Sequence, residues 1–190
     1  KNIIINTGIA SGRMGFIGEA QWQDKRALNG TVKLTKVNPA FIAPQWPGEL
    51  SGRWVMAAEN INGETADISI KGLDVRGTLR QRPIRLKTDL SYLNQRLNIP
   101  VFQLNSGQSE ITATGQMKER LTLNWRINSP NLADFYPELT GSLKASGTVS
   151  GHLAEPTVSA KIEANTIVYS DLMSIDKLVS DFSLDISQQG

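Results

Sequence analysis

The amino-acid sequence predicts an all-β chain of antiparallel strands. Apolar or small residues recur at every second position through most of the chain, which is the period of a strand with one buried face. The alternation is clearest between residues 121 and 164, where it covers Leu121, Leu123, Trp125 and Ile127, then Leu143, Ala145, Gly147 and Val149, then Val158, Ala160, Ile162 and Ala164. Each of these strands is therefore expected to have one apolar and one polar face.

The second observation is a proline-framed break that occurs twice. SPNLADFYPELTG starts at Ser129; its prolines cannot donate to a strand ladder, whereas the residues between them can form about one helical turn. A similar stretch, NPAFIAPQWPGELSG, starts at Asn38, and its first and last prolines and its Leu-x-Gly triplet precede their counterparts by 91, 90 and 89 residues. The sequence therefore predicts a supersecondary unit that repeats after about 90 residues, with copies at 30–60 and 121–150.

The N-terminal part is expected to hold short strands separated by turns. A strand at 3–5 precedes several glycines, whose spacing is not the GxGxxG of a phosphate-binding loop and favours turns or close backbone approach. Residues 18–24 and 30–37 then have the pattern of a hairpin with its turn at 24–29.

The apolar positions change parity in the middle of the chain. They are odd-numbered in 73–79 and even-numbered in 84–92, so the change falls at the turn between these two strands. Because the parity change brackets a turn, four basic side chains are expected on the face away from the apolar one: Arg76, Arg80, Arg85 and Lys87. We interpret this cluster as a solvated surface, and a site for an anionic headgroup or a partner is the alternative.

The remaining elements follow the same alternating pattern. The parity changes again across Pro100, which predicts a bulge or a sheet edge there. Further strands are expected at 167–169 and 182–186, and helical turns only at 40–43, 131–135 and 170–174.

Composition and charge exclude several classes of function. Twenty Lys and Arg against eighteen Asp and Glu give a net charge of +2, which favours neither nucleic acid nor an anionic membrane as a partner. The absence of cysteine excludes disulfides, thiol catalysis and cysteine metal sites. No apolar run reaches the roughly 18 residues of a membrane span, and no basic-then-apolar leader follows Lys1. We therefore interpret the chain as a fragment whose membrane anchor lies elsewhere.

Catalytic motifs are missing from the sequence. Its single histidine, His152, stands in an expected turn at 151–156 without HExxH or paired-histidine spacing, and no GxSxG is present. The acidic residues are scattered singly, which does not favour a paired-carboxylate hydrolase. The tryptophans are far apart, and Trp125 shares the parity of its apolar neighbours, so we expect apolar lining rather than stacking on sugars or bases. We expect no enzyme, no cofactor and no metal site.

Four stretches of the sequence carry a recognisable spacing of Pro, Gly and Leu: NPAFIAPQWPGELSG from Asn38, LNSGQSEITATGQM from Leu104, SPNLADFYPELTGSLKASGTVSGHLAEPTVSAKIEA from Ser129 and IVYSDL from Ile167. With these stretches the chain resembles the TamB family, the inner-membrane subunits of the translocation and assembly module of Gram-negative bacteria, which are related to the AsmA-like bridge proteins.

The resemblance implies a long curved antiparallel sheet, folded like a taco into an open groove with an apolar interior. It implies a location in the periplasm, with an anchor in the inner membrane that is absent from this chain, and an outer-membrane barrel partner, TamA, bound through regions that can lie outside it. Members of the family are implicated in phospholipid transport between the membranes, in the assembly of certain outer-membrane proteins and in autotransporter secretion.

Our hypothesis is one continuous β-groove over residues 1–190, in which phospholipid acyl chains take the place of a protein core. The residues expected to line it are Ile84, Leu86, Leu90, Leu97, Ile99, Ile111, Leu121, Leu123, Trp125, Ile127, Leu143, Val149, Val158, Ile162, Phe182 and Leu184. Two alternatives stay open: a folding scaffold that binds outer-membrane β-barrel or autotransporter proteins by β-augmentation, and a purely structural β-solenoid with a closed, dry interior.

Overall fold

The computed structural model describes residues 1–9, 11–22, 26–61, 66–152, 155–169 and 173–186. Strands occupy most of these residues, and they are β1 (Asn2–Ile9), β2 (Gly12–Gln21), β3 (Ala27–Val37), β4 (Gly48–Glu59), β5 (Asp67–Leu79), β6 (Arg82–Leu93), β7 (Arg96–Ser106), β8 (Ser109–Met117), β9 (Leu121–Ser129), β10 (Leu139–His152), β11 (Glu155–Tyr169) and β12 (Met173–Asp185). Two short 3₁₀ helices interrupt the strands, η1 (Pro39–Phe41) after β3 and η2 (Leu132–Asp134) after β9.

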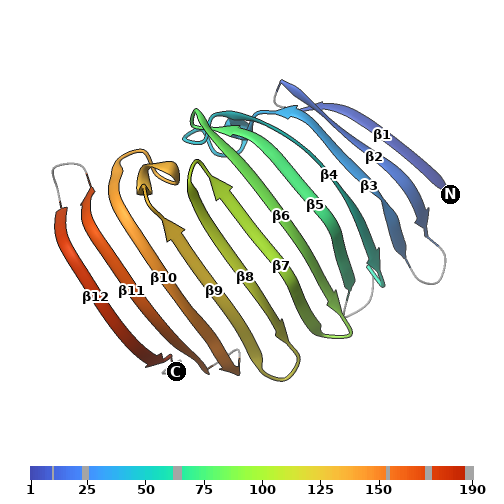
Figure 1. Ribbon diagram of the computed structural model, residues 1–190. Coiled ribbons are helices and arrows are strands. Elements are labelled where there is room, and N and C mark those ends of the chain that lie inside the picture. Colours follow the sequence, from blue (N-terminus) through green and yellow to red (C-terminus); the bar gives the residue numbers. More distant parts are fainter. Residues whose placement is uncertain (10, 23–25, 62–65, 153–154, 170–172, 187–190) are drawn as a thin grey trace. The chain divides into compact units, whose positions relative to one another are not determined.

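The chain forms two compact units, residues 1–101 and 102–190, with the boundary inside β7. In the first unit β1 to β6 pair in chain order, in the second β8 to β12 do so, and all of these pairs are antiparallel. Within each unit the strands are long and bowed, and neighbours in the chain lie side by side (Figure 1). The expected all-β antiparallel fold is confirmed, whereas one groove continuous over the whole chain stays a prediction.

The antiparallel register collects the apolar positions of each unit on one face. Successive side chains of a strand point to opposite sides of the sheet, so residues opposite each other on neighbouring strands share a face. In the second unit Ala145 of β10 lies opposite Ile127 of β9. In the first unit Val32 of β3 lies opposite Phe16 of β2 and Trp54 of β4.

A bulge on β5 keeps the face apolar where the sequence departs from strict alternation. The pairing of β5 with β6 shifts between Ile70 and Leu73, which lie three positions apart but share the apolar face. The extra residue, Gly72, has a φ of +62°, a left-handed value that glycine adopts without strain. The bulge therefore restores the two-residue period of the neighbouring strands.

Buried apolar residues are few and mostly small. Those of the described part are Phe16, Ala20, Val32, Ala58, Leu132, Ala145, Ala160 and Ala164. Larger side chains on the same faces stay half-buried or exposed, because each strand packs only against its neighbours in the sheet and against the two 3₁₀ helices, within the part of each unit that the structure describes. Neither unit has the second layer that closes the core of a β-sandwich, as far as the described residues go.

The two proline-framed breaks adopt the same local structure. Asn38 caps η1, where its side-chain oxygen accepts a hydrogen bond from the backbone N–H of Ala40 at 3.0 Å. Asn131 caps η2 in the same way, accepting from the backbone N–H of Ala133 at 3.2 Å. The helical turns expected in both breaks are confirmed, each as a single 3₁₀ turn.

Two local expectations are wrong, because pairing with long neighbouring strands extends strand structure into residues of weak strand propensity. β2 runs without interruption through Gly15 and Gly18, so no turn lies there, whereas the close backbone approach expected as the other possibility is found at Gly18, where a Cβ atom would lie 2.6 Å from Cα of Gly30. Ala27–Asn29 belong to β3 rather than to a turn, while residues 23–25 lie outside the described residues. His152 ends β10 opposite Glu155, within the stretch 151–156 where a turn was expected, and residues 153–154 lie outside the described residues.

Two further expectations are only partly covered by the structure. Of the helical turn expected at 170–174, residues 170–172 lie outside the described residues, and Met173 and Ser174 begin β12 as strand. Pro100 lies within β7, and the bulge or edge expected around it stays a prediction.

Candidate apolar binding face

The second unit arranges its apolar residues in cross-strand rows on one face. One row runs from β8 to β12 through Ala113, Trp125, Gly147, Ala160 and Phe182. Parallel rows lie on both sides of it, and all the groove residues that the sequence predicted for this unit lie on this face: Ile111, Leu121, Leu123, Trp125, Ile127, Leu143, Val149, Val158, Ile162, Phe182 and Leu184. We call this surface the apolar face of the second unit.

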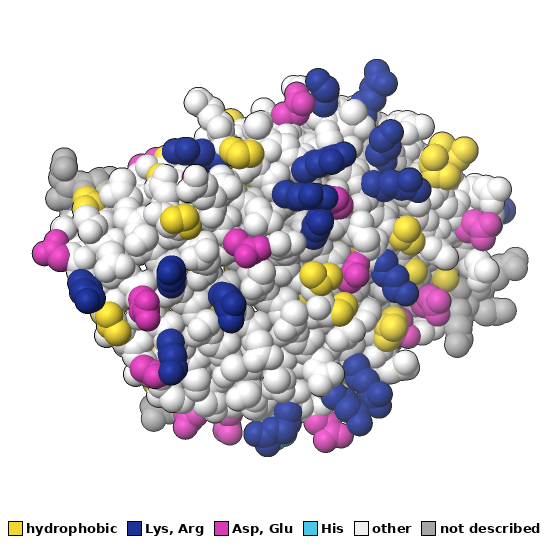
Figure 2. All heavy atoms as spheres, in the orientation of Figure 1, with side chains coloured by type: hydrophobic (Ala, Val, Ile, Leu, Met, Phe, Trp, Pro, Cys, Tyr) yellow, Lys and Arg dark blue, Asp and Glu magenta, His cyan; other side chains and the backbone are white. Residues whose placement is uncertain are grey.

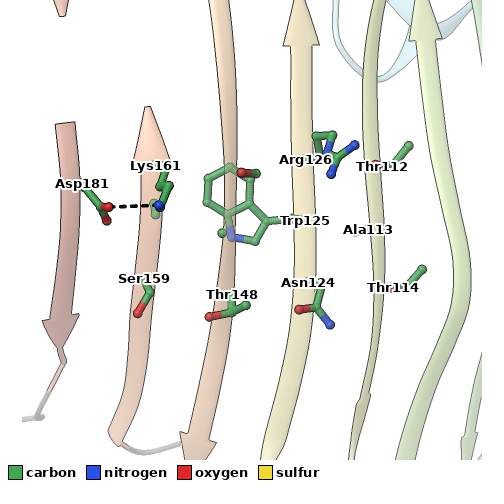
Figure 3. A pocket seen from close by; sticks show the side chains of 13 residues that line it. Thr112, Ala113, Thr114, Asn124, Trp125, Arg126, Thr148, Ser159, Lys161 and Asp181 are labelled. Atoms are coloured by element: carbon green, nitrogen blue, oxygen red, sulfur yellow. Dashed lines mark ion pairs between the residues drawn. The ribbon is translucent and has the colours of Figure 1, made fainter. Parts of the chain in front are cut away.

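Small residues in the central row make room for its aromatic side chain. A Cβ atom built at Gly147 would lie 2.8 Å from Cζ2 of Trp125 and 3.0 Å from its Cε2, so the indole ring lies directly over this glycine. Figure 3 shows the ring of Trp125 extending from β9 across β10. The ring therefore lies along the apolar face rather than standing up from it.

The first unit has an equivalent apolar face, and three residues of the predicted groove lie on it. Ile84, Leu86 and Leu90 of β6 stand opposite apolar or glycine positions of β5. Leu97 and Ile99 alternate along β7, and both are half-buried. The structure therefore brings the first three together on one surface and places the other two on one side of the following strand.

The predicted groove residues did not include the part of this face that β2, β3 and β4 form, although the tryptophans were expected as apolar lining. Phe16, Val32 and Trp54 make one cross-strand row there, and the ring of Phe16 lies over the next row, where a Cβ atom at Gly18 would be 2.7 Å from Cζ of Phe16. The alternation that could have revealed these residues was present, but glycines at the intervening apolar positions obscured it.

Much of the apolar area remains accessible in both units. Phe182 is 40% and Leu184 is 56% exposed in the second unit, while Ile5 is 50% and Ile68 is 40% exposed in the first. Side chains of this kind are usually fully buried when they line a closed core. The exposed apolar side chains on each of these faces therefore indicate a surface that can bind an apolar ligand.

The opposite face of β9 is polar. In β9 the side chains of Thr122, Asn124 and Arg126, which alternate with the apolar ones, are exposed. In the first unit the opposite face also carries exposed apolar side chains, with Ile4 70%, Ile17 63% and Val55 45% exposed. Figure 2 shows one face of the molecule, on which charged side chains are more numerous than hydrophobic ones. The two faces of β9 thus differ in chemistry as its alternating sequence indicated.

A shallow hollow of about 470 Å³ lies on the polar face of the second unit, beneath the glycine and alanines of the central row. Its lining includes Asn124, Thr148 and Ser159, together with Lys161 and Asp181, whose side chains form an ion pair with an Nζ–Oδ2 distance of 3.4 Å (Figure 3). Within the described residues, no group of three or more His, Cys, Asp or Glu side chains could hold a metal ion. The hollow is therefore a polar surface depression with hydrogen-bonding groups.

Comparison with known proteins shows the family to which the chain belongs. A family model described as the N-terminal domain of TamB matches residues 5–189, nearly the whole chain. The chain belongs to the TamB family. The translocation and assembly module subunit TamB of Haemophilus influenzae is 27% identical over 159 residues, which make up 82% of this chain and 12% of that protein. No solved structure matches the chain.

Among the described residues of this TamB-family chain, no helix is long and apolar enough to cross a membrane. The chain matches about an eighth, 12%, of the length of this curated relative. The activity of a whole TamB protein is therefore carried to this segment only as a proposal.

A buried polar cluster secures the second break of this TamB-family chain, and sequence reasoning did not find it. Asp134 of η2 is buried, and its Oδ2 accepts hydrogen bonds from the hydroxyl of Ser109 and from the backbone N–H of Gln108, each at 2.9 Å. The hydroxyls of Ser109 and Ser129 also lie 2.8 Å apart, and that of Ser106 donates to the Asp134 carbonyl at 2.6 Å. Because every one of these groups has a partner, we assign the cluster a structural role, holding η2 against the turn before β8.

Proposed function

We propose that this segment is part of the periplasmic portion of a TamB-type protein, anchored in the inner membrane through a region outside this chain. Its apolar face binds phospholipid acyl chains and lets them pass between the inner and outer membranes. In this role it supports the assembly of outer-membrane proteins together with TamA. The segment acts by binding and guiding its cargo, without catalysis and without a cofactor.

One observation carries this proposal: in the second unit, eleven residues expected from the sequence to line a groove share one face, where two of them, Phe182 and Leu184, are exposed and the other nine are half-buried. A closed solenoid would bury that face in its own interior, whereas an acyl-chain conduit needs it accessible. Family membership supports the same role, because the relative is named as a subunit of a translocation and assembly module.

The energetics of an alternating strand face suit transport. Each methylene removed from water contributes about 0.8 kcal/mol, so an acyl chain lying along several rows is held firmly. Rows of similar residues repeat about every 6.8 Å along a strand, since each residue advances about 3.4 Å. Equivalent rows offer nearly equal binding energies, and a lipid can move from one to the next without crossing a deep local minimum.

Site-specific photo-crosslinking tests the proposal in cells. A photoreactive amino acid at Leu123 or Trp125, on the apolar face, should capture phospholipid. The same amino acid at Asn124 or Arg126, on the polar face of the same strand, should not. Equal lipid capture at all four positions would remove the conduit from consideration, and capture of protein strands instead of lipid would favour the β-augmentation scaffold.

A pair of substitutions separates an accessible groove from a closed core. Leu123→Arg should leave the chain folded, because an arginine on an accessible face can extend its guanidinium to water, but should reduce the phospholipid that co-purifies. Asn124→Arg adds the same charge to the polar face and should change neither. In a closed, dry interior Leu123→Arg would bury an unpaired charge, so an insoluble variant would favour the structural solenoid.

A further inference from the structure

The basic residues of the chain are concentrated in its first unit. Residues 1–101 contain fourteen Lys and Arg against eight Asp and Glu, a net charge of +6, whereas residues 102–190 contain six against ten, a net charge of −4. The overall charge of +2 therefore conceals two opposite halves. Figure 2 shows Lys and Arg side chains gathered around an acidic one on the polar surface.

The register places several of these cations opposite one another on the polar face. Lys33 of β3 lies opposite Arg53 of β4, and Arg76 of β5 lies opposite Arg85 of β6. Like charges directly opposite in an antiparallel pair destabilise the sheet. Two such pairs on adjoining strands are therefore a cost in folding, which an anionic ligand would offset.

The bulge on β5 adds another cation to the same surface. The extra residue, Gly72, lets Lys71 stand opposite Val55 and Asp74 opposite Arg53, next to each other on the polar face. A Cβ atom at Gly72 would have no other atom within 4 Å, so the backbone is open to solvent at this point. Bulges commonly redirect a side chain beside a binding site.

The acidic side chain in this surface is already engaged. Asp74 Oδ1 accepts a hydrogen bond from Nε of Arg85 at 2.9 Å, and its Oδ2 accepts one from Nη2 at 2.6 Å. The hydrogen bonds from Arg85, followed by the positive charges of Arg85, Lys87 and Arg76, hold the pKa of Asp74 below its usual value. Among the described residues, Lys33, Arg53, Lys71 and Arg76 form no ion pair.

These four cations surround a hollow. It has a volume of about 550 Å³, and Lys33, Arg53, Lys71 and Arg76 all contribute to its lining, with Asp74 as its acidic member. That volume is in the range of pockets for small molecules, roughly 300–1,000 Å³. Two guanidinium groups beside two ammonium groups match the oxygens of a phosphate, which carries up to about two negative charges.

We propose that this hollow, on the polar face of the first unit, is a binding site for phosphate-bearing anions, either free or as a lipid headgroup. The site lies on the opposite face from the apolar rows and is independent of the proposed lipid conduit. Of the basic cluster that we interpreted from the sequence as a solvated surface, only Arg76 belongs to this site.

Binding of defined anions to the purified chain tests the site. The probes are inorganic pyrophosphate, glycerol 3-phosphate, and vesicles of phosphatidylglycerol with phosphatidylcholine vesicles as the neutral reference, each titrated at about 150 mM salt, where surface charges are screened beyond about 8 Å. Saturable binding of a phosphate probe is the expected result. Binding of the soluble phosphates assigns the site to free anions, and binding of phosphatidylglycerol vesicles alone assigns it to headgroups in a membrane.

The matched variants are two double substitutions that each remove two positive charges. Arg53→Gln with Lys71→Gln should weaken the binding at least about tenfold, since charge-assisted hydrogen bonds are lost. Arg126→Gln with Lys144→Gln, on the polar face of the second unit, should leave the affinity unchanged. Asp74→Asn removes the internal competitor for the cations and should strengthen the binding, which keeps the test decisive if the first variant folds poorly.

Three results would overturn the proposal. One is the absence of saturable binding of any phosphate probe at this salt concentration. Another is an equal loss of affinity in both double variants, because the binding would then depend on the net charge of the chain and not on a site formed by particular residues. The third is binding of polyglutamate without binding of phosphate, which would identify the surface as a contact for an acidic polypeptide.

Discussion

The indole ring of Trp125, on β9, lies over Gly147, the residue of β10 that stands opposite it in the same cross-strand row. Gly147 has no side chain, so the ring can lie close to the backbone of β10. Ala113 and Ala160 occupy the same row, and their small side chains leave the ring space along the sheet. The indole ring therefore lies along the sheet at this position. This arrangement also makes Trp125 and Gly147 depend on each other.

Gly147→Val should therefore destabilise the second unit. A Cβ atom there would lie against the backbone oxygen of Ser159 and 2.8 Å from Trp125 Cζ2, both closer than van der Waals contact allows, and overpacking of this kind costs about 1–3 kcal/mol. The midpoint of urea unfolding measures the loss. Gly8→Ala is the control, because a Cβ atom there meets nothing nearer than the Gly12 carbonyl at 4.0 Å.

A second-site change checks the cause of that loss. Trp125→Leu in the Gly147→Val background should recover part of the stability, since the shorter side chain no longer lies over position 147. Strictly additive effects of the two substitutions would contradict the contact.

Removing either capping asparagine should lower the free energy of unfolding, and the loss should be larger at Asn38 than at Asn131. Asn38→Ala and Asn131→Ala each remove a cap, which typically costs about 1 kcal/mol. Asn38 should matter more, because its side-chain oxygen accepts from the backbone N–H of Gly48 at 3.1 Å in addition to that of Ala40. Urea unfolding of both variants, with Asn124→Ala as an exposed reference, measures the order. A larger loss for Asn131→Ala would show that the second hydrogen bond of Asn38 contributes nothing.

Acid should weaken the contribution of the Asp74–Arg85 pair. The pKa of Asp74 lies below its usual value of 3.8, mainly through the hydrogen bonds from Arg85, so its ionised form is favoured in the folded state. Its stabilising effect is therefore complete above pH 3.8 and is lost as the pH falls through the lowered pKa. The effect is small, because the pair is largely solvent-exposed and screened.

The measurement compares the chain with its Asp74→Asn variant across pH. The variant should be slightly less stable than the unsubstituted chain near neutral pH, and the gap should close in acid, followed as the urea midpoint from pH 7 down to pH 2. Asp176→Asn, the same substitution at an exposed position of β12, is the control for the loss of one carboxylate. A gap that widens in acid would contradict the assigned direction.

The alternation of residues 121 to 127 was sufficient to predict that Leu123 and Trp125 share a face, and in the structure the residues of the second unit that were predicted to line a groove lie on one face, while their role as a groove stays a prediction. The reason is that the direction of a strand side chain depends on position parity, which is a local property. The two capped breaks were predictable on the same basis, because proline and asparagine act on the backbone next to them.

Other features could not be read from the sequence, because they depend on which residue of a distant strand stands opposite. In the sequence, Asp134 has the pattern of an ordinary turn residue. Only the folded structure brings the hydroxyl of Ser109 to its carboxylate and that of Ser129 to Ser109. The continuous β2 was hidden in the same way, since its glycines have weak strand propensity and the ladder with β3 overrides it.

By itself, then, the sequence determined an all-β antiparallel chain with one apolar and one polar face, through a period of two that any strand must obey. The tertiary structure alone decided that Trp125 lies over Gly147, that Gly72 forms a bulge and that Lys33 stands opposite Arg53. Register is the physical reason: each of these relationships joins side chains from different strands or adjusts one strand to its neighbours, and a shift of one residue would exchange the faces.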